Sequence, residues 1–393
     1  MSSEIFAVAA RRRAELVRKV ELLKGLGIGE RVSRVWVPYE PKPKPLPSVA
    51  GVDGGSGRVD FQGFTLYGVT AVASVYMGLE GGRYSRALTI PVADVDILTP
   101  PQAFGRIDLY RETLEAKVGV AALLEGSGLV LMDGSIKSVL ITPSPLNERA
   151  LPTALKEALN EFGVGVFNDL GREVTLSLTD LGRLKGSPLS SREVLRGRVP
   201  LSEEVLNAVV ALEYVEKLEV YRRLIVNASE YCVPVIFISK TGRSQVYFRS
   251  LSRELGIDVP SDINVFQYLT RGPGYSRPYL EERPLKVMPD ILNLKSFYSR
   301  LRVMISYVRL GEGLPVLKVE VPYVKPLSLG EAEDVVRDLM DCLTPISTGG
   351  YPYPLLEAHE LAHVRRHVME GVARVLGLTP YLTGREVLRE WAT

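Results

Sequence analysis

The sequence predicts a mixed-sheet α/β domain with helical insertions, and three observations support this prediction. Segments rich in Val, Tyr and Thr recur between residues 48 and 92, which is typical of strands. The helix-like segment 107–124 leads into the continuous apolar run 128–133, which has the composition of a strand buried on both faces. Helical and strand segments then alternate toward the end of the chain. Strands, a helix, a buried strand and further α/β units favour a sheet flanked by helices.

The chain is expected to begin with a helix and a connector, over residues 1–47. Residues 4–25 place apolar side chains at helical spacing, and glycines end that pattern. Five prolines between Pro38 and Pro47 exclude a helix there and predict an extended connector. The main domain is expected over 48–375, followed by a tail, 376–393.

Within the main domain, the strands and helices are predicted from periodicity and from breaker residues. The middle of the chain, about 150–230, is expected to be a helical insertion, and 205–224 is its clearest helix. Strands are predicted at 48–53, 65–77, 87–92, 128–133, 233–239, 302–308 and 316–321, and two closing helices at 329–342 and 354–376.

Composition limits the class of protein. With 46% hydrophobic and 24% charged residues, the 393-residue chain is expected to be an ordinary globular protein. No run approaches the ~20 uncharged apolar residues that span a bilayer, and the basic N-terminus lacks the apolar run of a signal peptide. We therefore expect a cytoplasmic protein without a membrane contact. Two cysteines are too few for a disulfide framework. A net charge of +2 means that any nucleic-acid contact depends on a local basic patch.

Two aspartates at matching positions are the most informative feature. Asp53 follows an apolar strand and precedes Gly54 and Gly55, and Asp133 stands between an apolar strand and Gly134. A buried carboxylate is costly unless a cation meets it. If the two strands are neighbours, both carboxylates emerge at one edge of the sheet and can share a divalent metal such as Mg²⁺ or Mn²⁺. The alternative interpretation is that each Asp-Gly pair only begins a turn.

Several motifs in order resemble the NurA nucleases, archaeal and bacterial enzymes that process DNA ends with the hexameric HerA translocase. The two aspartate segments look like the signature motifs of that family, and the later motifs follow in the same order. The matching segments are 50–54, 131–135, 237–244, 261–262, 273–274, 307–309, 315–322 and 350–359.

The resemblance implies a set of site residues. Asp53 and Asp133 match the metal-binding aspartates of the family, and His359 matches its C-terminal histidine, a metal ligand or a phosphate contact. A helix glutamate is expected between the aspartates. Glu115 is the prediction, and Glu112, one turn earlier, is the alternative. The further catalytic residues that the resemblance implies are Lys240, which could neutralise charge on the phosphate, and Tyr351.

The resemblance also implies a ribonuclease-H-like core and an activity. The expected protein is a homodimer that binds Mn²⁺ or Mg²⁺. It would act as a 5′-to-3′ exonuclease on single- and double-stranded DNA and as a single-strand endonuclease. Its expected partner is a HerA-type hexameric ATPase, in DNA end resection and double-strand-break repair. The chain has no G-x-x-x-x-G-K-[ST] loop, so another chain would supply ATP hydrolysis. A catalytically inactive adaptor of the translocase is an alternative that the two aspartates disfavour.

A second motif indicates a different enzyme. His359, Glu360 and His363 satisfy the H-E-x-x-H pattern of zinc proteases, and with His367 they predict three histidines on one helical face. The metzincin glycine is missing after His363, and two arginines follow close to the expected zinc. The zinc protease is therefore the alternative to the nuclease, with bound-metal analysis as the way to separate them.

Overall fold

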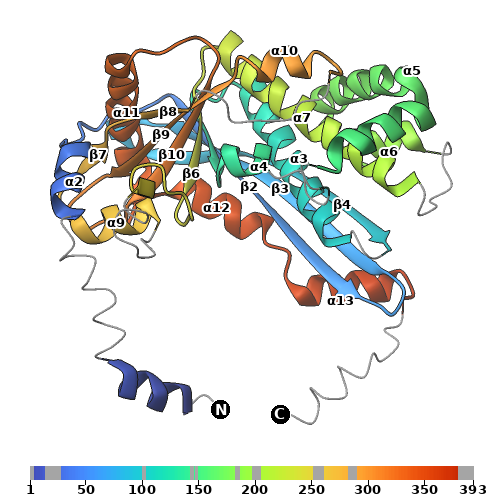
Figure 1. Ribbon diagram of the computed structural model, residues 1–393, viewed down its shortest axis with the longest axis horizontal. Helices are drawn as coiled ribbons and strands as arrows, with labels where there is room; N and C mark the ends of the chain where they lie inside the picture. The colour runs from blue at the N-terminus through green and yellow to red at the C-terminus, as the bar shows by residue number, and fades with distance from the viewer. Residues whose placement is uncertain are drawn as a thin grey trace.

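A ten-stranded mixed sheet forms the centre of the molecule (Figure 1). The computed structural model describes residues 4–13, 28–99, 103–141, 146, 149–181, 186–196, 205–250, 261–281 and 290–378. The strands are, in spatial order, β1 (Trp36–Pro38), β7 (Gly274–Ser276), β9 (Arg302–Arg309), β10 (Leu317–Tyr323), β6 (Val235–Ser239), β5 (Val130–Asp133), β2 (Ser48–Asp60), β3 (Thr65–Gly78) and β4 (Tyr84–Leu98), and β8 (Tyr279–Glu281) pairs with β9.

The centre of the sheet is parallel and its two sides are antiparallel. Strand β5 runs parallel to both β2 and β6, whereas β2, β3 and β4 form an antiparallel meander. Helix α3 (Ala103–Leu124) connects β4 to β5 and returns the chain to the end of the sheet at which β5 begins. Such a crossover is needed because β5 runs parallel to its neighbour β2. The carboxyl ends of β2, β5 and β6 therefore point the same way.

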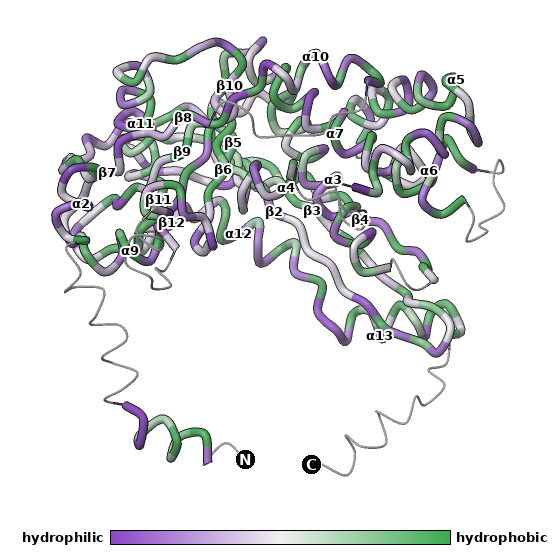
Figure 2. Tube along the Cα trace, in the orientation of Figure 1, coloured by the Kyte–Doolittle hydropathy of each residue, from purple (hydrophilic) through white to green (hydrophobic). Residues whose placement is uncertain are grey.

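Alternation along β5 separates two hydrophobic cores. Val130 and Met132 pack into the core on the side of α3, and Leu129 and Leu131 pack into the core on the opposite side. Strands β5 and β6 carry hydrophobic colour where they cross the centre of the molecule (Figure 2). A strand that is apolar on both faces must be covered twice, and helices supply both covers.

Two groups of helices cover these faces. On the α3 side lie α4 (Ile136–Ile141), α5 (Leu151–Thr179), α6 (Ser190–Leu195), α7 (Leu206–Glu230) and α10 (Leu294–Tyr298). On the opposite side lie α11 (Leu329–Leu343) and α12 (Tyr353–Ala362), and α13 (Arg366–Val375) packs on the outer half of β2 and β3. Helices α2 (Ile28–Val35) and α9 (Asp262–Leu269) contact each other beside β1.

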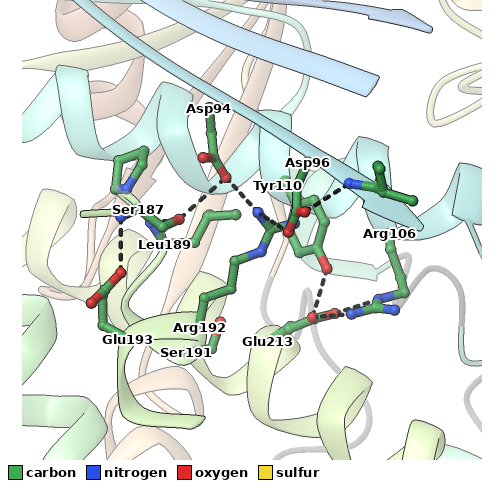
Figure 3. A network of polar contacts seen from close by, with 12 residues as sticks. Asp94, Asp96, Arg106, Tyr110, Ser187, Leu189, Ser191, Arg192, Glu193 and Glu213 are labelled. Carbon is green, nitrogen blue, oxygen red and sulfur yellow. Dashed lines mark hydrogen bonds and ion pairs between the residues drawn. The ribbon is translucent and has the colours of Figure 1, made fainter. Parts of the chain in front are cut away.

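Buried ion pairs connect the helices on the α3 side, here called the helical layer, to one another and to the sheet (Figure 3). Arg106 of α3 makes a two-pronged ion pair with Glu213 of α7, with N–O distances of 2.6 and 3.0 Å. Tyr110 donates to the same carboxylate at 2.6 Å. Arg192 of α6 reaches Asp94 of β4 at 2.7 Å. Pairing of this kind compensates the cost of burying each charge.

The structure confirms the mixed sheet with flanking helices, and it corrects some predicted bounds. Strand β2 does not end at Asp53 but continues through the glycines to Asp60, because the long β3 provides hydrogen bonds along its whole length. The predicted helix 354–376 is two helices, α12 and α13, separated at 363–365. Residues 4–13 are helical, whereas 14–27 and 379–393 lie outside the described residues. None of the described helices combines the length and the apolar character needed to cross a membrane.

Candidate metal centre

The register of β2 and β5 brings the two aspartates together. Val52 lies opposite Met132 in this parallel pair, so the next residues along the two strands are Asp53 and Asp133. Both follow a residue of the α3-side core, and strand alternation therefore turns both carboxylates to the α12 side. The sequence-based expectation that the two strands are neighbours is confirmed.

Glycines on either side of Asp53 allow α12 to pack along β2 at close range. A Cβ atom at Gly51 would lie 2.2 Å from the backbone carbonyl carbon of Pro354, at the start of α12. At Gly55 it would lie 1.9 Å from the carbonyl oxygen of Ala362, at the end of that helix. Gly51, Asp53 and Gly55 share one face of the strand. The helix therefore runs along the strand, with Asp53 beneath its middle.

This packing places His359 over Asp53. The Nδ1 atom of His359 lies 2.6 Å from Oδ2 of Asp53, whose Oδ1 accepts a 2.7 Å hydrogen bond from the backbone N–H of Gly54. The Asp53 side chain is 7% exposed and that of His359 is 60% exposed. Ligand atoms of Asp53, Asp133 and His359 all lie within 4.8 Å of one another. Two carboxylates and an imidazole at this separation fit a divalent ion such as Mn²⁺.

Tyr351 and Lys240 form the second layer of this centre. The phenol of Tyr351 donates a 2.8 Å hydrogen bond to Oδ1 of Asp133. Tyr351 stands in the short hairpin of β11 (Ser347–Thr348) and β12 (Tyr351–Pro352), directly after Gly349 and Gly350, whose positive φ values of 60° and 81° form the turn. The Nζ atom of Lys240 lies 3.7 Å from the centre of the Tyr351 ring, so its charge is held against the ring face.

Glu115 approaches Asp53 from the other face of the sheet. A Cβ atom at Gly54 would lie 2.5 Å from Oε1 of Glu115, so this glycine lets the carboxylate lie against the strand. Glu115 is 5% exposed, and Arg111 pairs with it at 2.5 Å. Burial raises the pKa of Glu115 to about 8; Arg111 opposes the rise, and Asp53 adds to it.

Glu112, the alternative glutamate, is bound elsewhere. Its Oε2 atom accepts a 3.0 Å hydrogen bond from Nζ of Lys217, a fully buried lysine on α7. Because that carboxylate neutralises Lys217, Glu112 has a structural partner of its own. The geometry favours Glu115 as the glutamate that belongs to the aspartates, although its carboxylate is not within the group of ligand atoms formed by Asp53, Asp133 and His359.

Electrostatics in the cluster favour a bound cation. Burial raises the pKa of Asp53, and the neighbouring carboxylate of Asp133 raises it further, against hydrogen bonds from His359 and Gly54 that lower it. Burial and Asp133 likewise raise the pKa of the Tyr351 phenol, which keeps it a hydrogen-bond donor. A buried carboxylate whose pKa is raised by a neighbouring carboxylate is expected where a positive ion completes the site.

The three histidines do not share a helical face, so that prediction is wrong. Helix α12 ends at Ala362, and His363 follows with ψ of 112°, an extended conformation. The carbonyl of Ala362 accepts a 2.5 Å hydrogen bond from the Thr70 hydroxyl, which holds the helix end against β3. His367 belongs to α13. Within the described residues, His363 joins no group of potential metal ligands.

Two contributors to this centre were not predicted from the sequence. Arg111 is the cation that Glu115 meets, and its position four residues earlier on α3 is the spacing of a helical ion pair, which was the available signal. Gly51 is required by the approach of α12, and no local pattern in the sequence could reveal that contact.

The family comparison agrees with this geometry. A model described as the NurA domain matches residues 47–364, which include both aspartates, Glu115, Lys240, Tyr351 and His359. The chain belongs to the NurA family. Among curated NurA proteins, the probable DNA double-strand break repair nuclease NurA of Methanocaldococcus jannaschii is 25% identical, over 94% of this chain and 88% of its own length. The DNA double-strand break repair nuclease NurA of Sulfurisphaera tokodaii is 23% identical, over 96% of both chains.

Solved NurA structures share the fold. The crystal structure of the NurA nuclease from Sulfolobus solfataricus superposes with a TM-score of 0.64 at 18% identity, covering 96% of this chain and 97% of the other. A NurA crystal structure with bound dAMP and manganese gives a TM-score of 0.65 at 16% identity, covering 90% and 92%. The likeness extends over nearly the whole described chain, helical layer included.

Proposed function

We propose that this NurA protein is a metal-dependent deoxyribonuclease, and that Asp53, Asp133 and His359 hold its Mn²⁺ or Mg²⁺. The observation that carries the proposal is the convergence of these three side chains, with ligand atoms within 4.8 Å, at the end of a parallel strand pair. The manganese and dAMP in a related NurA structure support the same chemistry. Carboxylate oxygens and an imidazole nitrogen are ligands that Mn²⁺ accepts.

In this proposal Glu115 is the further carboxylate of the metal site. It would leave Arg111 and turn toward Asp53 when the ion binds. The proposed ligands come from three parts of the fold: Asp53 and Asp133 from the sheet, His359 from α12 and Glu115 from α3. Ligands from separate elements hold a fixed geometry only when those elements are packed together, as the glycines of β2 allow.

When bound, a divalent ion supplies charge stabilisation on phosphoryl oxygens and activation of the attacking water. Lys240 would stabilise negative charge that develops on the phosphate, because its ammonium lies over the ring of Tyr351, whose hydroxyl binds Asp133. Tyr351 would orient Asp133 through its hydrogen bond. His359, with 60% of its side chain exposed, would meet the ion or the phosphate from the solvent side.

The finer activities are extensions of this proposal. We infer a 5′-to-3′ exonuclease and single-strand endonuclease that acts in end resection with a HerA-type hexameric ATPase, as a homodimer. Membership of the family supports these inferences, and the missing P-loop motif is consistent with a separate ATPase. We also assign the core to the ribonuclease-H-like class, on the antiparallel meander β2–β3–β4 joined through α3 to the parallel strands β5 and β6.

Metal exchange tests the proposed function. Protein stripped with EDTA is given Mn²⁺, Mg²⁺ or Zn²⁺, and the degradation of linear DNA and of casein is measured in parallel. We expect DNA degradation with Mn²⁺ or Mg²⁺ and no casein cleavage with any ion. Casein cleavage restored by Zn²⁺ would favour the zinc protease. Binding of a HerA-type partner without DNA degradation under any condition would favour the inactive adaptor.

A further inference from the structure

A polar cavity of about 570 Å³ opens on the α3 side of the sheet, at the carboxyl end of β5 that also carries Asp133. Four cationic side chains line it, from α4, from the segment after β6 and from β10. These are Lys137, Arg243, Arg249 and Lys318. One acidic side chain, Glu281 of β8, lines it with them. Serine hydroxyls complete the lining, so the cavity is rich in hydrogen-bond donors.

Two of the four cations are neutralised where they stand. Lys137 pairs with Glu281 at 2.7 Å. The Lys318 side chain is 6% exposed and pairs with the fully buried Glu320. Glu320 also accepts hydrogen bonds of 2.9 and 2.8 Å from the Ser135 hydroxyl. These pairs fix the inner wall of the cavity and add no net charge.

Arg243 and Arg249 give the cavity its surplus of positive charge. Neither has an ion-pair partner among the described residues, and both side chains are exposed at the cavity. A guanidinium with free donors binds a phosphate through two parallel hydrogen bonds. A surplus of two positive charges over a wall of fixed ion pairs therefore suits an anion with several oxygen acceptors.

Two chain segments contribute residues to both the cavity and the metal centre. Ser135, in the cavity wall, comes two residues after Asp133, and its neighbour Gly134 accepts a 2.7 Å hydrogen bond through its carbonyl from Ser239. Arg243 comes three residues after Lys240, whose charge lies over Tyr351. Both segments leave the carboxyl ends of β5 and β6, which are adjacent parallel strands.

We propose that Arg243 and Arg249 in this cavity bind a phosphate of the DNA substrate, and that this phosphate is not the scissile one but another on the same strand. The assignment rests on the proposed nuclease function. The ligand is a nucleic-acid phosphate, either an internal diester or a terminal monoester. Two cations at the same end of β5 and β6 as the metal centre would set the position of the DNA strand relative to the scissile bond.

Oligonucleotide binding tests the assignment. The variant Arg243→Ala/Arg249→Ala is compared with the control Arg172→Ala/Arg196→Ala, which removes the same charge from side chains that are 80% and 73% exposed in the helical layer. Fluorescein-labelled single strands with a 5′-phosphate, a 5′-hydroxyl or a 3′-phosphate are titrated in EDTA at several salt concentrations. For the cavity variant we expect a Kd raised about tenfold or more. The slope of log affinity against log salt should be shallower by roughly 0.7 for each phosphate that the variant no longer neutralises.

The three strands distinguish the sources of the phosphate. A loss of affinity confined to the 5′-phosphate or to the 3′-phosphate strand would identify that terminal group as the ligand, and an equal loss for all three would identify an internal diester. Equal Kd values and salt slopes for the cavity and control variants would overturn the assignment. Wild-type cleavage of a chromogenic phosphodiester with Mn²⁺ reports the proposed function separately. Wild-type protein that neither binds the strands nor cleaves that diester would overturn both.

Discussion

Tyr351 connects the ligand Asp133 to the cation Lys240, so its hydroxyl is a direct test of the second layer. Tyr351→Phe keeps the ring under Lys240 and removes the 2.8 Å hydrogen bond to Asp133. We expect Mn²⁺ affinity, or the cleavage rate at saturating Mn²⁺, to fall about 10- to 100-fold, as for other residues that orient a metal ligand. Isothermal titration and a nuclease assay measure the two quantities, and unchanged values for both would show that the hydrogen bond is dispensable.

Glu115 predicts a pH dependence of metal binding. Its pKa of about 8 means that most of the metal-free protein carries a protonated Glu115 at pH 7. A carboxylate must lose its proton to bind an ion, so Mn²⁺ binding at pH 7 should release about one proton, and affinity should rise until the pH exceeds 8. Calorimetry in two buffers with different ionisation enthalpies measures this release.

The matched control is Glu115→Gln, which has no proton to release. It should release about one proton fewer than the wild type when Mn²⁺ binds at pH 7, and its affinity should rise less between pH 7 and 8. A wild-type heat that does not depend on the buffer would contradict the assignment of Glu115 to the metal site.

For single residues, a local sequence pattern predicted the pair of aspartates, and only the family resemblance indicated the residues around it. Asp53 and Asp133 could be predicted because an acidic residue after an apolar strand is a local pattern. The choice of Glu115 over Glu112 needed the structure, since both lie on one helix and only the packing of α7 occupies Glu112 with Lys217. The H-E-x-x-H pattern also could not be judged from the sequence. It binds zinc only on a continuous helix, and α12 ends before His363.

The contact between α12 and β2 decides whether His359 reaches Asp53. Gly51→Ala would place a methyl group 2.2 Å from the backbone of Pro354, and backbone cannot move aside as a flexible side chain can. We expect at least ~1–3 kcal/mol of destabilisation from overpacking and a Mn²⁺ affinity lowered on the order of tenfold. Chemical denaturation and metal titration measure these effects.

Gly63→Ala is the control, because Gly63 is exposed and nothing lies within 4 Å of its added Cβ. Its stability should change by less than about 1 kcal/mol, with Mn²⁺ affinity unchanged. Equal behaviour of the two variants would mean that α12 is not held by this close approach.

The elements were predicted where their signal is local. The apolar run ending at Asp133 predicted β5, and proline spacing predicted the connector, whose Lys42 and Lys44 bind α11 through Asp341 and Asp338. The break after Ala362 has no proline or glycine to announce it, because the helix ends against Thr70, 292 residues away in sequence. The three-residue strands β1, β7 and β8 depend on pairing with distant partners, which composition cannot reveal.

For the whole molecule, buried ion pairs join the helical layer to α3 and so support the helix that carries Glu115. Glu213→Ala leaves Arg106 buried without its carboxylate, and Arg106 is only 6% exposed. We expect a loss of about 3–5 kcal/mol in the free energy of unfolding, measured by urea denaturation. Glu370→Ala, which removes an ion pair whose arginine side chain is 57% exposed, should change it by less than about 0.5 kcal/mol. A similar loss in the free energy of unfolding for both variants would show that the buried ion pair stabilises the fold no more than the exposed one.

The most direct test of the central claim is the degradation of end-labelled single-stranded DNA with Mn²⁺ by the wild type, Asp53→Ala and His363→Ala. Asp53 is a proposed metal ligand, and His363 lies beyond the end of α12. We expect cleavage by the wild type and His363→Ala, and a loss of at least about 100-fold with Asp53→Ala, since removing a ligand removes the ion's contribution to the transition state. Cleavage that survives Asp53→Ala, or that His363→Ala abolishes, would contradict it.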